Sequence, residues 1–419
     1  MSYITIIDNE KVLLVLLLLA TFALLSILLR QRYYCLLIRY AKWQNEEQTI
    51  AEATHDAINA IDSAVSDPSV SIIIPCNESE LPALEQLLPR LFSQNYKGKF
   101  EIVVVNEDNS ALTKDKVSSI QEYSPNLRYS FIPSSSRNIE KRKLAITIGI
   151  KASHGIWAII LNANVRPVND NWLSHYVQHF SSETNFVSAY YNYDNDWSTA
   201  VKNAILDRIS NVVNQIVANE RGEYIINGDV NWAVRCSWFI EQQGFAESLI
   251  LPFGEEAILA NHRIEPRQGI LLFSPSTKLV EEVVYENSKT LLYRQIINTE
   301  ISHHLNGRSR LLLRFCNAQS LAPLIFLLSI LAYITIRFVS LYYHEAYDTS
   351  SVAFDAIFVL LLTVSISASI VCAKKLMKSL HENIPCLFLL RYSLLKPFRL
   401  LQVSLLRIGH KQDFNRNYL

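Results

Sequence analysis

Residues 70–80 read VSIIIPCNESE, and this stretch decides the fold of the 419-residue chain. The run VSIII is rich in β-branched residues and ends at Pro75, which predicts a buried strand. Polar residues follow at once, from Cys76 to Glu78. Leucines then recur at helical spacing between Leu84 and Leu91, so a helix is predicted after the polar turn. A strand, a polar turn and a helix form the unit from which parallel α/β sheets are built.

Two further predicted strands are also followed by short polar segments. We call these segments the polar tails of the strands. FEIVVV at 100–105 precedes NEDNS, and WAIIL at 157–161 precedes NAN. A strand at 127–132 and a helix at 141–152 lie between them, and this alternation predicts an α/β fold with a parallel sheet. Ligands of such sheets gather at the carboxyl ends of the strands, so the three tails are predicted to face one crevice. For any one tail alone an ordinary turn is the better interpretation.

Three long apolar runs predict transmembrane helices, since about 20 apolar residues cross the hydrocarbon core of a membrane. The runs are 12–29, 315–336 and 356–373. Basic residues follow the first and the last run, whereas the loop before the last run is mainly acidic. The positive-inside rule therefore predicts the N-terminus outside and residues 31–314 in the cytoplasm. A cleaved signal peptide is the alternative for the first run, and its Arg-rich flank argues against it.

These runs and strands divide the chain into eight predicted parts. The final stretch, Arg391–Arg407, alternates apolar residues with bases and is predicted to break at Pro397. It is interpreted either as an amphipathic segment on the inner membrane face or as a helix packed on the sheet domain. The parts are a short extracytoplasmic N-terminus (1–11), a transmembrane helix (12–30), a cytoplasmic helical connector (31–68), the sheet domain (69–314), a transmembrane helix (315–337), an extracytoplasmic loop (338–355), a transmembrane helix (356–373) and a cytoplasmic amphipathic tail (374–419).

Composition excludes several classes of protein. Only 10 glycines are present, and neither G-x-G-x-x-G nor G-x-x-x-x-G-K-[ST] occurs, which excludes the glycine-rich phosphate loops of dinucleotide-binding and Walker-type proteins. The 39 basic and 39 acidic side chains cancel without a strongly basic block, which argues against a nucleic-acid partner. The 6 cysteines show no C-x-x-C spacing, so no zinc or disulfide framework is predicted.

The order of the motifs resembles that of the membrane-bound family 2 glycosyltransferases. That family has the GT-A fold, a Rossmann-like α/β sheet domain that binds nucleotide sugars, followed by membrane helices. SIIIPCNESE is similar to the family's first strand with P-x-x-N-E, and VVVNEDNS is similar to its D-D-x-S-like loop. The order is specific, whereas each motif alone is weak. The resemblance covers roughly residues 69–305, including NGDVNWAVRCSWFIEQQGF at 227–245, PFGEEAILAN at 252–261 and YRQIINTEISHH at 293–304.

The resemblance implies a role for residues in each motif. Glu256 falls at the position of the general base that removes the acceptor proton, with Glu255 beside it. Acids in the second-strand loop would contact the nucleotide. The implied donor-binding residues are Pro75, Asn77, Glu78, Glu107, Asp108, Lys143, Asn162 and Asn164, and the implied acceptor or diphosphate contacts are Gly228, Asp229, Arg294 and Gln295.

Two motifs depart from the family pattern where the diphosphate would be bound. The family's D-x-D holds Mg²⁺ or Mn²⁺, but here it reads Asn162-Ala163-Asn164. An asparagine oxygen is neutral and hard cations depend on ligand charge, so Asn164 is expected to be only a weak metal ligand. Where Q-x-x-R-W is expected, Gln295 is followed by Ile-Ile-Asn-Thr, without the arginine and the tryptophan.

Two functions follow from the sequence. The first is a hexosyl-type, inverting glycosyltransferase of the inner membrane, multi-pass, with the sheet domain facing the cytoplasm. It would use a nucleotide sugar, by preference a UDP-sugar, and a lipid-linked or cell-envelope glycan acceptor. The alternative is a catalytically inactive homologue that serves as a scaffold or partner subunit in envelope polysaccharide synthesis. The loss of two diphosphate motifs is the reason to keep this second hypothesis.

Overall fold

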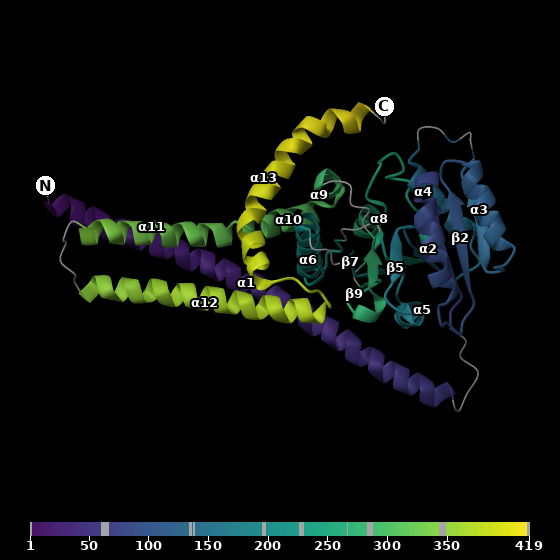
Figure 1. Ribbon diagram of the computed structural model, residues 1–419, viewed down its shortest axis with the longest axis horizontal. Helices are drawn as coiled ribbons and strands as arrows, with labels where there is room; N and C mark the ends of the chain where they lie inside the picture. The colour runs from purple at the N-terminus through teal and green to yellow at the C-terminus, as the bar shows by residue number, and fades with distance from the viewer. Residues whose placement is uncertain are drawn as a thin grey trace. The chain divides into compact units, whose positions relative to one another are not determined.

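The protein was analysed as a computed structural model of the full chain (Figure 1). It forms two compact units, a sheet unit of Arg39–Arg310 with Val403–Leu419 and an apolar unit of Met1–Ile38 with Leu311–Gln402. The described residues are all except 1, 60–66, 134–135, 137–138, 195–197, 226–229, 266, 283–287, 343–348 and 417–419.

The sheet unit contains a seven-stranded sheet with the order β3-β2-β1-β4-β8-β6-β9. The first four strands are parallel, whereas β8 runs antiparallel to both β4 and β6. The predicted strands and the α/β class are confirmed, but the sheet is mixed because β8 reverses direction. The strands are β1 (Val70–Cys76), β2 (Phe100–Asn106), β3 (Leu127–Phe131), β4 (Trp157–Ile160), β6 (Phe186–Ala189), β8 (Trp232–Arg235) and β9 (Gly269–Leu272).

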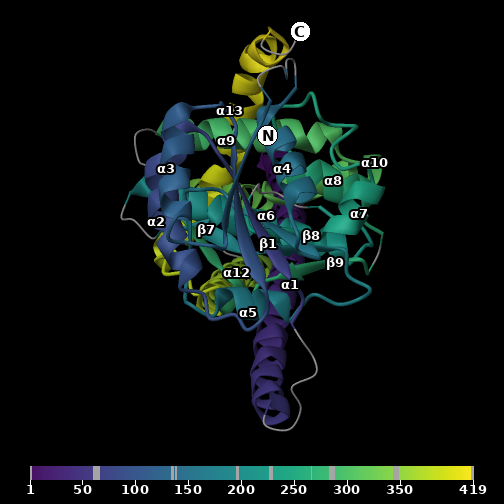
Figure 2. The ribbon, with the colours of Figure 1, turned by 90° about the vertical axis from the view of Figure 1, so that its right-hand side faces the viewer.

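Helices cover both faces of the parallel half of the sheet. Figure 2 shows α2 and α3 on one side of β1 and α4 on the other. Ile72 and Ile74 belong to the core cluster with the leucines of α2. Ile73 faces the opposite way, where its Cγ2 lies 2.4 Å from the place that a Cβ on Gly149 of α4 would take. Burial on both faces explains why β1 is a continuous apolar run and not an alternating one.

The sheet unit also contains a second, smaller sheet and further helices. A second sheet of three short strands has the order β5-β10-β7, namely β5 (Val165–Pro167), β10 (Leu279–Glu281) and β7 (Tyr191–Tyr193). The helices are η1 (Glu78–Glu80), α2 (Leu81–Phe92), α3 (Ala111–Gln121), α4 (Lys141–Ala152), α5 (Trp172–Val177), α6 (Thr199–Asn219), α7 (Cys236–Glu241), α8 (Glu255–Arg263), η2 (Pro275–Thr277) and α9 (Ser288–His304).

Three helical segments of the described chain are long and apolar enough to cross a membrane, as the sequence predicts. They are Lys11–Glu46, Gly307–Val339 and Asp355–Ser379. The first lies in α1 (Ser2–Asn59), the second runs over α10 (Gly307–Gln319) and α11 (Ala322–Tyr342), and the third lies in α12 (Thr349–Ser379).

Within the apolar unit, α1, α11 and α12 lie side by side (Figure 1). Ala20 and Ala23 of α1 belong to one buried cluster with Phe326 of α11 and Phe358 of α12. Small side chains on α1 allow the helices to approach closely. Apolar helices surrounded by lipid associate through such close packing, because the hydrophobic effect does not drive them together there.

The C-terminal stretch differs from its prediction. Helix α13 spans Cys386–Arg416 and continues through Pro397, which was expected to break it. A proline removes one backbone hydrogen bond and crowds the preceding turn, but many intact turns remain on both sides here. The prediction of a break at Pro397 is therefore wrong.

We expect Gly155→Ala to lower the melting temperature of the full chain in detergent by several degrees. A Cβ at residue 155 would lie 2.5 Å from the backbone nitrogen of Ser71, so β1 or the turn before β4 must move. Overpacking of this kind costs about 1–3 kcal/mol, and each kcal/mol lowers the melting temperature by about 2–4 °C in a domain of this size. Gly307→Ala is the control, since its methyl group would meet no atom within 4 Å. Equal melting temperatures of the two variants would contradict the expectation.

Candidate functional site

The polar tails of β1 and β2 are joined by direct hydrogen bonds. The backbone N–H of Glu78 donates to Oδ2 of Asp108 over 3.0 Å, and the Ser110 hydroxyl donates to Oε2 of Glu78 over 2.5 Å. The other carboxylate oxygen of Asp108 accepts from the N–H of Ser110 over 3.2 Å. The first two predicted tails therefore meet at one edge of the sheet.

Asn77 gives the first tail its shape. Its side-chain oxygen accepts from the N–H of Glu80, and the Glu80 carboxylate accepts from the N–H of Asn77, both over 3.2 Å. This reciprocal pair is a capping box that starts η1 and α2. Pro75 lies inside β1, opposite Val105 of β2, and so has a structural position. The P-x-x-N-E-like sequence thus fixes the turn that carries Glu78 to Asp108.

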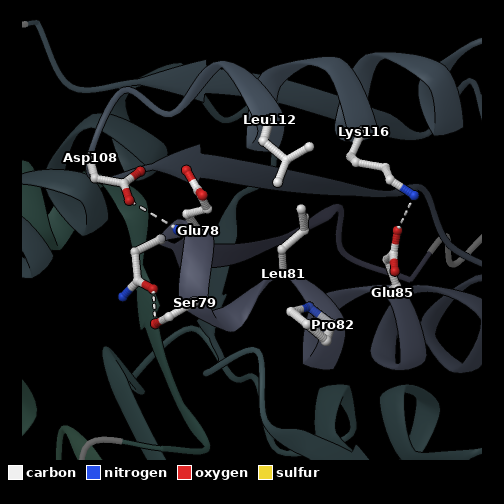
Figure 3. A pocket seen from close by; sticks show the side chains of 9 residues that line it. Glu78, Ser79, Leu81, Pro82, Glu85, Asp108, Leu112 and Lys116 are labelled. Atoms are coloured by element: carbon white, nitrogen blue, oxygen red, sulfur yellow. Dashed lines mark hydrogen bonds and ion pairs between the residues drawn. The ribbon is translucent and has the colours of Figure 1, made fainter.

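A pocket of about 670 Å³ opens beside these tails (Figure 3). Glu78 and Asp108 lie at one end, and the ion pair between Lys116 and Glu85, 2.8 Å, lies at the other. Leu81 of α2 and Leu112 of α3 form the apolar surface between the two ends. A flat ring with hydroxyl groups at one edge fits this arrangement, because carboxylates accept hydroxyl hydrogen bonds and leucines pack on the ring.

Arg142 connects the third tail to the second. Its Nη1 lies 3.1 Å from Oε1 of Glu107 and 3.6 Å from Oε1 of Glu80. Its guanidinium also donates to the side-chain oxygen of Asn162, which follows β4. The three tails therefore meet at one crevice, as predicted, but an arginine that the sequence interpretation did not select holds them together.

Lys143, the residue next to Arg142, has a different position from the one predicted. It is completely buried, and its Nζ donates to the carbonyls of Ser248, Leu251 and Phe253 over 2.7–2.9 Å. Adjacent residues on a helix point about 100° apart, so only one of the two can face the crevice. The predicted donor contact by Lys143 is corrected to a structural role, namely fixing the segment before α8.

The Glu107 carboxylate is the electrostatically strained group of this crevice. Burial raises its pKa, and the neighbouring carboxylates of Glu80 and Glu140 add to the rise. Arg142 opposes the shift through its charge and its hydrogen bond, but it does not cancel it. Glu107 therefore binds a proton more readily in the folded chain than an exposed glutamate does.

Asn164 belongs to a second group of polar residues, formed around the short sheet. Its Nδ2 lies 3.4 Å from Oε1 of Glu281, the last residue of β10. Nearly all of Glu281 is buried, and it bonds Nη1 of Arg294 over 2.6 Å and lies 3.6 Å from Nη2 of Arg208. The Tyr193 hydroxyl accepts from both arginines over 3.1 and 3.2 Å. We call Asn164, Tyr193, Arg208, Glu281 and Arg294 the Glu281 cluster.

Comparison with known proteins finds a family whose model matches part of the chain. Residues 71–245 match the model of glycosyl transferase family 2. This stretch is less than half of the 419 residues, and it agrees with the family that the motif order resembles. The GT-A fold class predicted from the motif order is thereby confirmed.

Relatives of the family 2 domain match short parts of the chain. An N-acetylglucosaminyltransferase of Mesorhizobium japonicum is 35% identical over 97 residues, which are 23% of this chain and 22% of that protein. An N-acetylglucosaminyltransferase of Bradyrhizobium diazoefficiens is 33% identical over 98 residues, 23% of this chain and 19% of that protein. The chain thus matches about a fifth of the length of these two relatives. Among solved structures, a mannosyltransferase from Pyrobaculum calidifontis in complex with GDP-Man and Mn²⁺ has a TM-score of 0.48 and 14% identity, over 91% of this chain and 99% of that one.

The residues at the family's metal position do not fit a divalent cation. The oxygen of Asn162 that a metal would need already accepts from Arg142, and Asn164 donates its amide towards Glu281. The Glu281 carboxylate is itself engaged by arginine. Within the described residues no group of three His, Cys, Asp or Glu side chains is arranged to hold a metal.

The predicted catalytic acids lie at the start of α8, after the end of the region that matches the family 2 model. Gly254, the residue before the helix, has a left-handed backbone with φ of 73°, which a glycine adopts without strain. Glu255 and Glu256 follow in the first turn, where the helix dipole favours negative charge. Glu256 is completely buried, and its Oε1 accepts from the Ser188 hydroxyl over 2.7 Å. The acid at the base position is therefore held by a strand residue that sequence analysis did not select.

The other predicted contacts have separate outcomes. Arg294 lies in the Glu281 cluster, where the Glu281 carboxylate raises the pKa of its guanidinium. Gln295 donates to Asp207 of α6, so it ties α9 to α6. Gly228 and Asp229 lie outside the described residues. From the basic helix start at 141–143 the sequence interpretation selected Lys143 and not Arg142, and it did not select Glu281, which ends the short strand LVE.

We expect Glu107→Gln to remove a pH-dependent loss of stability. Because the pKa of Glu107 is raised on folding, its contribution is fully present below the unfolded value of 4.5 and is lost as pH rises through the folded value. Melting temperatures of wild type and variant are measured between about pH 4 and about pH 8. The melting temperature of the wild type should fall relative to that of the variant as pH rises.

The control for this measurement is Glu247→Gln. Glu247 forms an ion pair with Arg263, and its side chain is 58% exposed. The melting temperature of this variant should change with pH in the same way as that of the wild type. The same pH dependence for Glu107→Gln would contradict the raised pKa of Glu107.

Proposed function

We propose that this protein is a membrane-bound, inverting glycosyltransferase that moves a sugar from a nucleotide-sugar donor to a lipid-linked or cell-envelope glycan acceptor. The observation that carries the proposal is the bonded pair of tails, in which the Glu78 N–H meets the Asp108 carboxylate inside the matched family 2 region. Next to this pair the pocket of leucines and carboxylates has the chemistry that a nucleoside requires.

The donor is proposed to be a UDP-sugar. Its base would pack on Leu81 and Leu112, and its ribose hydroxyls would reach Glu78 and Asp108. The diphosphate would then lie over the crevice, where Arg142 and the Glu281 cluster are positioned. The names of the curated relatives support N-acetylglucosamine as the first sugar to test.

The proposed reaction is a single displacement at the anomeric carbon. The acceptor oxygen forms the new glycosidic bond while the bond to the diphosphate oxygen breaks, so the configuration inverts. Glu256 takes the proton of the acceptor hydroxyl, and the leaving diphosphate carries the electron pair away. Since Glu256 is buried and bonded to Ser188, its carboxylate must exchange this contact for the acceptor hydroxyl during the reaction.

The proposed membrane arrangement follows the charge pattern of the sequence. The three apolar segments anchor the chain in the inner membrane, the domain at 69–314 and the tail at 374–419 face the cytoplasm, and the loop at 338–355 faces outward. A cytoplasmic domain has access to nucleotide sugars, and an adjacent membrane surface presents a lipid-linked acceptor.

The second candidate is an inactive homologue that acts as a scaffold or partner subunit in an envelope-glycan complex. The observation that favours it is the pair Asn162 and Asn164 in place of two carboxylates, together with the full burial of Glu256. The two candidates differ in one measurable property, because only the enzyme turns over a donor.

We expect Glu256→Gln to lower sugar transfer by about 10²–10⁴-fold, the usual contribution of a general base. The full chain in detergent is given UDP-N-acetylglucosamine and a lipid extract, and UDP release is followed. UDP affinity, measured in parallel by calorimetry, should not change, because Glu256 does not touch the donor. The control is Glu247→Gln, whose exposed ion pair with Arg263 lies outside the crevice. A wild type that binds UDP but releases none from any UDP-sugar would favour the scaffold.

We expect Thr349→Cys to react with a membrane-impermeant maleimide in right-side-out membrane vesicles. In the proposed orientation the native cysteines, at 35, 76, 236, 316, 372 and 386, lie in membrane spans or on the cytoplasmic side, so the wild type should stay unlabelled. Lys151→Cys is the matched control, exposed on α4 and labelled only after the vesicles are permeabilised. The reverse pattern would contradict the orientation.

A further inference from the structure

The Glu281 cluster is assembled by strand pairing. In the short sheet, Glu281 of β10 pairs with Val165 of β5 on one side and with Tyr193 of β7 on the other. Asn164 immediately precedes β5, and its backbone carbonyl accepts from the N–H of Glu282 over 2.8 Å. The register therefore brings the Glu281 carboxylate to the residue that stands where the family has the second carboxylate of D-x-D.

Two arginines meet at one buried carboxylate in the cluster. One buried carboxylate, that of Glu281, is shared by the guanidinium groups of Arg294 at 2.6 Å and Arg208 at 3.6 Å. Arginine keeps its charge in any protein environment, so both guanidinium groups stay positive beside Glu281. Glu282 and Asp194, which directly follow β10 and β7, are bound by Arg166 at 3.4 and 2.7 Å. Two guanidinium groups thus surround the carboxylate that Asn164 faces, where the family pattern would have a carboxylate at residue 164.

The two arginines are held in fixed positions. The Arg208 guanidinium stacks on the ring of Tyr191 with 3.7 Å to the ring centre, and it also donates to the Tyr191 hydroxyl. Tyr193 accepts from both arginines, as described above. Positive groups that are oriented before the reaction stabilise developing negative charge without the cost of reorganisation. Arginine also matches the spacing of phosphate oxygens, with two parallel N–H donors.

We propose that Arg208 and Arg294 neutralise the donor diphosphate, so that this domain binds nucleoside diphosphates and transfers sugar without a divalent cation. The inference rests on the proposed function and names the positive groups that act on the donor diphosphate. The side-chain oxygen of Asn162 accepts from Arg142, and the amide of Asn164 donates to Glu281, so neither is free to bind a metal. The adjacent cluster supplies fixed guanidinium groups. The asparagines at 162 and 164 and the two fixed guanidinium groups beside Glu281 are thus two parts of one arrangement.

The test compares nucleoside diphosphates with nucleosides by titration calorimetry on the full chain in detergent. UDP and uridine are titrated in excess EDTA and again with Mn²⁺, and GDP with guanosine forms a parallel pair. We expect wild type to bind UDP equally well in both buffers. Arg294→Gln and Arg208→Gln should each weaken UDP binding at least about tenfold, or about 1.4 kcal/mol, and leave uridine binding unchanged.

Two further variants sharpen the comparison. Arg294→Lys keeps a positive charge without the planar fork, so it should recover part of the UDP affinity. Arg308→Gln is the control, because Arg308 is 86% exposed and lies 3.7 Å from Glu223 outside the cluster, and its ratio of UDP to uridine affinity should equal that of the wild type.

The outcomes separate this inference from the proposed function. UDP binding by wild type only with Mn²⁺ would overturn the inference and leave the glycosyltransferase proposal standing. An equal loss of UDP and uridine in the arginine variants would overturn it too, since that result marks a structural role. No binding of any nucleotide in either buffer would sink the proposed function itself. The comparison of EDTA with Mn²⁺ in wild type tests the inference even where an arginine variant does not fold.

Discussion

The burial of β1 on both faces is the constraint on which the sheet unit depends. Ile72 and Ile74 pack on α2 while Ile73 packs on α4, so the strand buries apolar side chains on both faces apart from Ser71, whose hydroxyl donates to Glu101. Asn77 then starts the next helix, and this turn aims the Glu78 backbone at Asp108. The crevice therefore lies at the carboxyl edge of the sheet, where the chain leaves the apolar core.

The electrostatics of the crevice follow from two asparagines. Asn162 accepts from Arg142, and Asn164 faces the carboxylate of Glu281. A carboxylate in place of either asparagine would change the charge balance with these partners. An aspartate at 164 would put two negative groups side by side, and the arginines around Glu281 would have to balance both. The asparagines and the arginines thus form one consistent arrangement, in which side chains supply the positive charge.

Glu256 shows how the same fold restrains the chemistry. Its place at the start of α8 and its bond to Ser188 fix the carboxylate beside the central sheet, where the helix dipole stabilises its charge. The fixed position suits a group that must hold one orientation towards an acceptor. In the proposed reaction, full burial also means that the acceptor hydroxyl has to replace the contact with Ser188.

The sequence by itself predicted the first four strands, the three apolar segments long enough to cross a membrane and the place of the first two polar tails, because these depend on local apolar periodicity and on residues next to each other in the chain. It could not choose Arg142 over Lys143, since the direction of a helix face depends on what packs against it. The tertiary structure alone decided the Glu281 cluster. Its members, at 164, 193, 208, 281 and 294, are distant in sequence, and they meet only because β10 pairs between β5 and β7.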